Sequence, residues 1–371
     1  MNNKYLQKCL QLLGVIIFIT VVSSCKKDKS TTTATVVDAT PVNLGLFEYS
    51  DGTNYRIFIP LQQVGTQTVN DDLVFDTGSA GLALDASGII PDTMITKNGF
   101  VFSGDSVVVN GITITSTQSE MDYGNNTDMT VVKGNLAYAN ITLNNNASGI
   151  VIKRVPFFIY YGVFDVVNGN TANETQLPAH SADIFGVSPE YSYASNLIQS
   201  PLSYYKPGTG LTNGFKLAKL IPGGFTTAGV YESNLLTLGL TKTDIASSSG
   251  FITHNESFTS TDGYSPDVPG TITYSGNTLS ANFLFDSGTP EISIIENSTA
   301  STGILPAGTA ITLKTTEGFT YSYTTSSSSQ ITEVENPKVT GDTRTIFSLE
   351  FFMNNEYLTN YASHQIGLKN N

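Results

Sequence analysis

The fold of this chain is decided by the stretch Leu73-Val74-Phe75-Asp76-Thr77-Gly78-Ser79, which has a second copy in Phe283-Leu284-Phe285-Asp286-Ser287-Gly288-Thr289. In each copy an apolar run ends in an aspartate, and a hydroxyl residue, a glycine and another hydroxyl residue follow. An aspartate at the end of an apolar strand is costly to bury unless its charge is satisfied. Because this costly feature occurs twice in the same local pattern, we expect Asp76 and Asp286 to lie together.

The composition favours strands and turns over helices. Of the 371 residues, 33 are glycine, 40% are apolar and only 13% are charged. Serine, threonine and asparagine are also plentiful, and sustained helical periodicity is absent beyond the N-terminal apolar run. A chain of this length and apolar content is expected to form two domains or one large bilobal unit.

The first 24 residues are predicted to be a signal peptide. Lys4 and Lys8 precede an apolar run at residues 10–22, and small residues then lead to Cys25. The run is too short to span a bilayer comfortably; a secretory signal with a chance cysteine and a membrane anchor are the alternatives. The pattern resembles bacterial lipoproteins, which are cut before the cysteine and acylated on it. We therefore expect lipidation at Cys25 and a place in the bacterial cell envelope, on the outer membrane or cell surface.

This interpretation has consequences for the folded part of the chain. Cys9 and Cys25 are the only cysteines, so no disulfide and no cysteine metal site is expected there. Loss of Lys4 and Lys8 would make the net charge more negative than −13, which argues against nucleic acid as a partner and against a basic membrane-binding face. Residues 25–41, rich in Lys, Ser and Thr, are predicted to be a flexible tether.

Strand and turn signals continue from Val42. The Asn110-Gly111 pair predicts a hairpin between residues 106–109 and 112–114, and Ser275-Gly276-Asn277 predicts another between 270–274 and 278–285. An alternating strand at 55–59 is expected to end at Pro60, and a short helix is expected near residues 193–199. A segment rich in Pro and Gly at 201–214 suggests a boundary between an N-terminal lobe at 42–212 and a C-terminal lobe at 213–371.

The paired motifs resemble those of the pepsin-like aspartic peptidases, and further segments of that family follow in the same order. The matching segments are Tyr123-Gly124 with Gly134–Tyr138 for the flap hairpin, Ala182–Val187 for the segment that buttresses the first aspartate loop, Val230–Leu240 for the strand that opens the second lobe, and Ile346–Leu368 for the C-terminal segment. The resemblance covers residues 44–368. It implies an all-β, bilobal fold with two related barrel-like lobes and a central active-site cleft.

The resemblance also implies a chemistry that the residue types support. Hydrolysis of a peptide bond needs a base to activate water and an acid to protonate the leaving groups. Two close carboxylates can supply both, because like charges in one site share a proton. Asp76 and Asp286 are therefore the predicted catalytic dyad of an aspartic endopeptidase. The substrate would be an extended polypeptide, and a monomer without metal or cofactor is expected.

Supporting roles in the two loops are implied by the same resemblance. Each loop glycine lets the backbone turn tightly after its aspartate. The first hydroxyl residue of each loop would brace the opposite loop, and the second would hydrogen-bond the outer carboxylate oxygen of its own aspartate. Tyr123 and Gly124 would belong to a mobile flap that positions the substrate. The supporting residues are Thr77, Gly78, Ser79, Ser287, Gly288 and Thr289.

An alternative function is a catalytically silent binding module of the same fold, for a peptide, protein or glycan at the cell surface. Ser348 stands where the family has a small glycine, and the flap tip Asn125-Asn126 lacks the usual small residues. A structural envelope lipoprotein without a ligand is a third and weaker alternative. His180, His254 and His364 are far apart and have no metal-ligand spacing, so no metal site is predicted.

Overall fold

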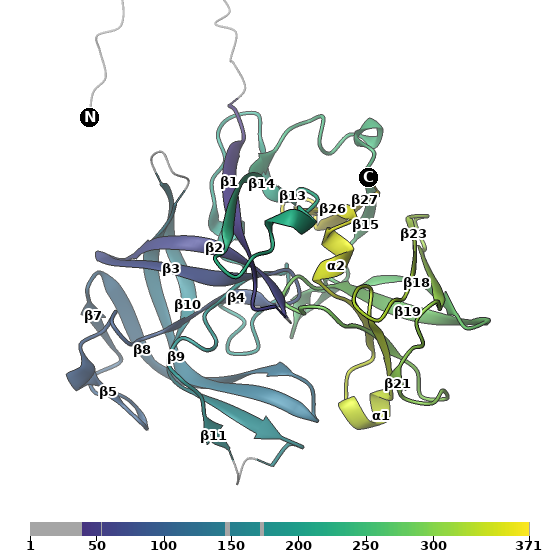
Figure 1. Ribbon diagram of the computed structural model, residues 1–371. Coiled ribbons are helices and arrows are strands. Elements are labelled where there is room, and N and C mark those ends of the chain that lie inside the picture. Colours follow the sequence, from purple (N-terminus) through teal and green to yellow (C-terminus); the bar gives the residue numbers. More distant parts are fainter. Residues whose placement is uncertain (1–38, 53, 145–148, 171–173, 371) are drawn as a thin grey trace, which may run out of the picture. The chain divides into compact units, whose positions relative to one another are not determined.

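The computed structural model describes residues 39–370, apart from 53, 145–148 and 171–173 (Figure 1). The predicted signal peptide, the lipidation site at Cys25 and most of the predicted tether lie outside the described residues. Strands are the main regular structure of the described part and its helices are few and short, so the all-β class is confirmed. None of the helices in this part combines the length and the apolar content that crossing a bilayer requires.

The larger sheet contains a closed ring of strands. Its order is β15-β27-β26-β13-β14-β1-β2-β3-β12-β4-β10-β9-β8-β7, with β11 paired to β10, and an additional pairing of β2 with β9 closes six of the strands into a barrel-like ring. Strand β1 joins this ring to strands from the second half of the chain. The strands are β1 (Val42–Ser50), β2 (Tyr55–Val64), β3 (Gln67–Asp76), β4 (Ala80–Asp85), β7 (Ser106–Val109), β8 (Ile112–Gly124), β9 (Asp128–Leu143), β10 (Ile150–Val167), β11 (Thr175–Gln176), β12 (Ile184–Val187), β13 (Thr212–Leu217), β14 (Val230–Leu240), β15 (Ile252–Asn255), β26 (Asn355–Asn360) and β27 (Gln365–Asn370).

The second large sheet comes entirely from the C-terminal half of the chain. Its order is β21-β24-β20-β25-β19-β18-β22-β23, and two short ribbons, β5-β6 and β16-β17, stand apart from both sheets. The strands are β18 (Val268–Tyr274), β19 (Asn277–Phe285), β20 (Ser293–Glu296), β21 (Gly303–Ile304), β22 (Ala310–Thr315), β23 (Thr320–Thr324), β24 (Thr332–Glu335), β25 (Arg344–Phe347), β5 (Ile95–Thr96), β6 (Gly99–Phe100), β16 (Phe258–Thr259) and β17 (Gly263–Tyr264). The helical segments are short: η1 (Asp92–Met94), η3 (Pro201–Tyr204), η4 (Pro222–Gly224), η5 (Ser247–Ser249), α1 (Pro337–Thr340) and α2 (Leu349–Phe352).

The same strand arrangement carries each aspartate motif. Strand β3 ends at Asp76 and runs parallel to β12, with Asp76 paired to Gly186. Strand β19 ends at Phe285, directly before Asp286, and runs parallel to β25, with Phe285 paired to Phe347. In both halves, a second strand therefore fixes the end of the strand that presents the aspartate.

Both hairpin predictions are confirmed. Val109 pairs with Ile112 around the first turn, and Tyr274 pairs with Asn277 around the second. The two central residues of each turn have positive φ angles, with 51° at Asn110 as an example. These are the angles of the tight turns whose twist matches that of two antiparallel strands.

Two local predictions are wrong. Strand β2 does not end at Pro60 but continues to Val64, with Pro60 opposite Asp72. Residues 193–199 form turns and not a helix. There, the hydroxyl of Ser192 accepts the N–H of Ala194, and the backbone N–H of Ser195 donates to the carbonyl of Ser192. Such local hydrogen bonds compete with helical ones.

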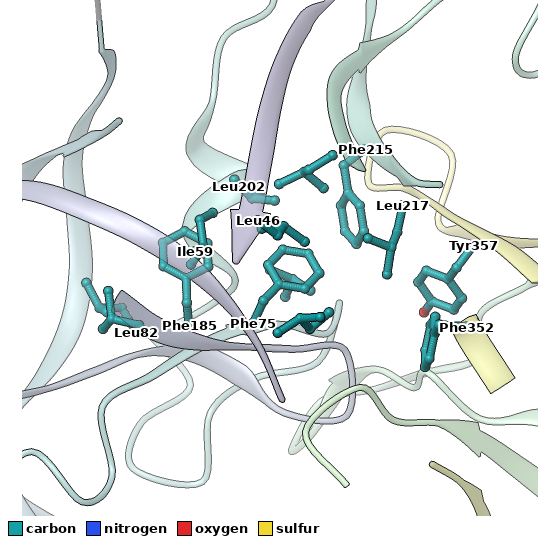
Figure 2. Packing of buried hydrophobic residues seen from close by; sticks show 14 of the residues in the cluster. Leu46, Ile59, Phe75, Leu82, Phe185, Leu202, Phe215, Leu217, Phe352 and Tyr357 are labelled. Atoms are coloured by element: carbon teal, nitrogen blue, oxygen red, sulfur yellow. The ribbon is translucent and has the colours of Figure 1, made fainter. Parts of the chain in front are cut away.

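An aromatic and aliphatic core fixes the strand that ends in Asp76. Phe75 is fully buried and lies edge-on to Phe215, with 5.8 Å between the ring centroids. Figure 2 shows Phe75 among apolar side chains of several elements, including Leu46, Ile59 and Phe185. Burying a phenylalanine stabilises a fold by about 1.5–3 kcal/mol. The carboxylate of Asp76 therefore stands on a strand that packing holds rigidly.

Candidate active site

Asp76 is held by its own loop. The N–H groups of Gly78 and Ser79 donate to Oδ1 of Asp76 at 2.7 and 3.2 Å, and the Ser79 hydroxyl donates to Oδ2 at 2.6 Å. Asp76 is buried, and its side chain keeps only a small exposed area. These contacts fix both carboxylate oxygens.

Asp286 is held in the same way. The N–H of Gly288 donates to Oδ1 of Asp286 at 2.8 Å, and the hydroxyl of Thr289 donates to Oδ2 at 2.6 Å. The N–H of Asp286 itself donates to the carbonyl of Phe347 on β25 at 2.9 Å. In both loops, the glycine N–H thus donates to Oδ1 of the aspartate and the second hydroxyl residue donates to Oδ2.

The loop glycines bring the two aspartates together. A Cβ atom on Gly78 would lie 2.4 Å from Cγ of Asp286, and a Cβ atom on Gly288 would lie 2.6 Å from Cγ of Asp76. Neither distance leaves room for a methyl group, because real Cβ contacts do not occur under 3.0 Å. Each glycine is therefore required for the close approach of the opposite carboxylate.

A symmetrical brace joins the two loops beneath the carboxylates. The hydroxyl of Thr77 donates to the carbonyl of Phe285 at 2.7 Å and accepts the N–H of Ser287 at 2.9 Å. The hydroxyl of Ser287 donates to the carbonyl of Phe75 at 2.7 Å and accepts the N–H of Thr77 at 3.0 Å. Both hydroxyl residues are buried. The resemblance to the pepsin-like peptidases implies such a brace. In the structure, each of the two hydroxyls contacts a carbonyl and an N–H of the opposite loop.

The environment of Asp76 disfavours its ionised form. Burial holds the pKa of Asp76 well above its usual range, and the charge of Asp286 acts in the same direction. The two carboxyl groups lie within hydrogen-bonding reach of each other. A pair in this position retains one proton at a pH where an isolated aspartate has lost it. Such a pair can supply an acid and a base at one site.

A cavity of about 420 Å³ opens over the dyad and is lined by both aspartates together with Tyr123 and Arg56. Arg56 is half-buried, and burial lowers its pKa while the charges of Asp286 and Asp76 raise it. The sequence had given no signal for Arg56, because a lone arginine in an alternating strand is ordinary. The cavity is large enough for part of a peptide.

The flap is the hairpin of β8 and β9, and its tip reaches the C-terminal half of the chain. Tyr123 pairs with Thr130, and its hydroxyl contacts Sδ of Met121 at 3.6 Å. Oδ1 of Asn125 accepts the N–H of Thr127 at 2.9 Å and thus closes the turn. Across the cavity, the N–H of Asn126 donates to the carbonyl of Thr340 at 3.0 Å. Asn125 therefore shapes the turn, and Asn126 ties it to Thr340.

Known proteins resemble this chain in structure. No family model and no curated protein matches its sequence. Among solved structures, it is similar to the aspartic proteinase from Irpex lacteus, at 15% identity and a TM-score of 0.52, and to Basic 7S globulin from soybean, at 10% identity and a TM-score of 0.53. Each alignment covers 89% of this chain and 97% of the other. The chain has the bilobal pepsin-like fold. The fold class predicted from the paired motifs is thus confirmed.

The two buttress positions of this pepsin-like fold differ for a steric reason. A Cβ atom on Gly186, behind Asp76, would lie 2.6 Å from the carbonyl oxygen of Ser79. Ser348, at the matching place behind Asp286, has an ordinary φ of −69°. Its buried hydroxyl donates to the carbonyl of Glu291 at 3.1 Å. The replacement of glycine by Ser348 is therefore accommodated without disturbing the loop.

One group of side chains that sequence spacing did not suggest could hold a cation. Asp71, His180 and Asp183 each offer one ligand atom, and these atoms lie within 4.8 Å of one another. Sequence spacing predicts no metal site at His180, but its Nδ1 lies 2.6 Å from Oδ2 of Asp183. Asp183 also accepts a hydrogen bond from the hydroxyl of Tyr160 at 2.6 Å. The histidine and the two carboxylates already pair with each other. Asp183 directly precedes β12, so these contacts help to hold the strand that pairs with the end of β3.

Proposed function

We propose that this protein is an aspartic endopeptidase, which cleaves peptide bonds with a water held between Asp76 and Asp286. The observation that carries the proposal is the mutual approach of the two carboxylates, which Gly78 and Gly288 permit. The brace through Thr77 supports it, because it keeps the two loops in register. A fold shared with a proteinase and a globulin does not decide the activity, so the proposal depends on this geometry.

The reaction follows from a dyad that carries one proton. The ionised carboxylate would take a proton from the water, whose oxygen attacks the carbonyl carbon of the scissile bond. The protonated carboxyl group would give its proton to the carbonyl oxygen. In the second step, the carboxyl group that took the water proton gives it to the amide nitrogen, and the other carboxylate takes a proton from one hydroxyl of the tetrahedral intermediate. The C–N bond breaks, a carboxylic acid and an amine leave, and the dyad again carries one proton. Tyr123, at the wall of the cavity, would help to position the peptide under the flap.

A peptide-library digest from acid to neutral pH tests the proposal. Asp76→Asn should lower cleavage about 10³-fold or more, with a melting temperature close to that of the parent. Asp72→Asn is the matched control, since it removes an exposed carboxylate from the same strand. An aspartic-peptidase transition-state inhibitor should block the parent. Equal cleavage by the parent and the Asp76→Asn variant would rule out the dyad.

A binding module of the same fold is the second candidate function. The hydrogen bond between Asn126 and Thr340 favours it, because a flap tied across the cavity could restrict the entry of long substrates. If this candidate is correct, peptides bind to the parent without being cleaved at any pH. Binding by both the parent and the Asp76→Asn variant, together with the absence of products, would establish it.

We also propose that the protein is anchored through lipid on Cys25, in a bacterial envelope. The basic residues Lys4 and Lys8, the apolar run and the small residues before Cys25 support this. Metabolic labelling with an alkyne fatty acid should mark the full-length protein. Cys25→Ser should lose the label and Cys9→Ser should keep it. Labelling of the Cys25→Ser protein would contradict the proposal.

A further inference from the structure

The cleft continues beyond the dyad into a second, larger cavity. This cavity has a volume of about 740 Å³. It shares Asp122, Tyr193 and Arg344 with the cavity over the dyad, so the two are parts of one cleft. Glu190 and Asp267 line only the second cavity. A chain bound at the dyad can therefore extend past these two residues.

The second cavity is strongly acidic. Among the described residues that line it, Arg344 carries the only full positive charge, against the carboxylates of Glu120, Asp122, Glu190, Asp262, Asp267 and Asp342. Arg344 is already engaged: its Nε lies 3.0 Å from Oδ1 of Asp342, and its Nη2 lies 2.6 Å from Oδ2. This bidentate pair occupies Nε and Nη2 of Arg344, although its charge still acts on Glu190 and Asp267. The other carboxylates of the cavity are left with an excess of negative charge.

Among these carboxylates, Glu190 gives the clearest indication of a cationic ligand. It is only 9% exposed, and no hydrogen bond to its carboxylate is present among the described residues. Burial raises the pKa of Glu190 to about 8; the charge of Arg344 opposes this shift, and the charges of Asp267 and Asp262 add to it. Nearby, the buried Oδ1 of Asp267 also lacks a hydrogen-bond partner. A buried carboxylate oxygen without a hydrogen-bond donor is costly, and one positive charge faces six carboxylates here, so this arrangement is suited to a ligand that brings positive charge and N–H donors.

We propose that Glu190 and Asp267 form a pocket for a lysine or arginine side chain of the substrate, so that cleavage occurs near basic residues. This proposal names the substrate class of the proposed peptidase, and it therefore depends on that proposed function. Tyr193 is 68% exposed and lines both cavities, so its ring is placed to cover the alkyl part of a long cationic side chain. An uncharged side chain of the same length would leave Oδ1 of Asp267 without a donor and the excess negative charge of the cavity uncompensated, which gives discrimination as well as affinity.

Paired peptides test the proposal. Dye-labelled peptides that differ only by lysine or norleucine, placed in turn at each position around the scissile bond, are compared for binding by anisotropy and for cleavage. With the parent protein, lysine at one position should raise kcat/KM and affinity by about 10–100-fold over norleucine. Glu190→Gln and, independently, Asp267→Asn should remove most of this preference. Asp92→Asn, which removes an exposed carboxylate from η1, should keep it.

The outcomes separate the pocket from the peptidase. Cleavage of lysine and norleucine peptides at equal rates by the parent would overturn the pocket and leave the peptidase standing. Lysine-dependent binding without any cleavage, lost in Glu190→Gln, would support the pocket and overturn the peptidase. Equal binding of both peptides by all variants would overturn the pocket. Because the comparison within the parent needs no variant, a misfolded variant does not block the test.

Discussion

Gly78 lies directly against the carboxylate of Asp286, a residue 208 positions further along the chain in the second copy of the motif. A Cβ atom on Gly78 would be 2.4 Å from Cγ of Asp286, and the φ angle of Gly78 is not in the left-handed region. The glycine is thus needed for space and not for its backbone angle. Gly288 makes the reciprocal contact with Asp76, so the close approach of the two carboxylates depends on the glycines of both loops.

This contact predicts that Gly78→Ala removes the activity without unfolding the protein. The added methyl group has to displace the carboxylate of Asp286, and an error of about 1 Å in catalytic geometry costs about 10²-fold in rate. Overpacking of this kind lowers the free energy of unfolding by about 1–3 kcal/mol. The kcat/KM of a cleaved library peptide checks the first effect, and urea unfolding checks the second.

Gly223→Ala is the matched control for this prediction. Gly223 also has no left-handed φ angle, and a Cβ atom there would meet nothing within 4 Å. The control should keep both activity and stability. Full activity in Gly78→Ala would contradict the assigned approach of the two loops.

The brace beneath the dyad predicts that Thr77→Val destabilises the protein. Valine keeps the shape of threonine but leaves the carbonyl of Phe285 and the N–H of Ser287 buried without their partner. The free energy of unfolding should fall by roughly 2–4 kcal/mol. Urea unfolding followed by fluorescence measures it. Thr68→Val, at an exposed position of the same strand, should change it little, and an equal loss in both variants would argue against the brace.

Local patterns were sufficient to predict the dyad loops and the hairpins. The repeated Asp-hydroxyl-Gly-hydroxyl pattern follows from contacts within each loop and with its copy, and positive φ angles explain the turn residues. The pairing of His180 with Asp71 was not predictable, because it arises only when β12 lies beside β3. The same is true of Glu190 and Asp267, which no local pattern connects. Long-range strand pairing, which brings such residues together, leaves no signature in spacing.

The buried carboxylate of Glu256 predicts that stability falls as the pH rises. Its two oxygens lack hydrogen-bond partners, and burial raises the pKa of Glu256 to about 8 from an ordinary value of 4.5. As the pH rises, the unfolded chain therefore loses this proton at a lower pH than the folded protein does. The contribution of protonated Glu256 to the free energy of unfolding is thus complete below pH 4.5 and is lost between about pH 4.5 and 8.

Glu256→Gln should accordingly raise the melting temperature at pH 8 by roughly 2–4 °C, for a gain of at least about 1 kcal/mol, and change it little at pH 4. Differential scanning calorimetry at the two pH values measures this. Asp105→Asn, at an exposed position, is the control and should show no such difference. A stabilisation of Glu256→Gln that is equal at both pH values would mean that proton release is not its cause.

The tip of the β8–β9 hairpin is held by a hydrogen bond between Asn126 and Thr340, next to Gly341. The N–H of Asn126 donates to the carbonyl of Thr340, and a Cβ atom on Gly341 would lie 2.3 Å from Nδ2 of Asn126. A methyl group at position 341 therefore has to displace the side chain of Asn126. The carbonyl that accepts the hydrogen bond from Asn126 belongs to the last residue of α1, so the contact depends on this short helix.

Gly341→Ala should speed hydrogen exchange of the flap-tip amides if the Asn126 side chain, displaced by the added methyl group, can move only together with the backbone N–H that donates to Thr340. Mass spectrometry of a peptide covering residues 121–129 measures the exchange. Gly276→Ala is the matched control: both glycines have a φ of +79°, but a Cβ atom on Gly276 meets nothing within 4 Å. Adding Asn126→Ala to Gly341→Ala removes the clash and should restore protection. Unchanged exchange in Gly341→Ala would show that the tip is held by other contacts.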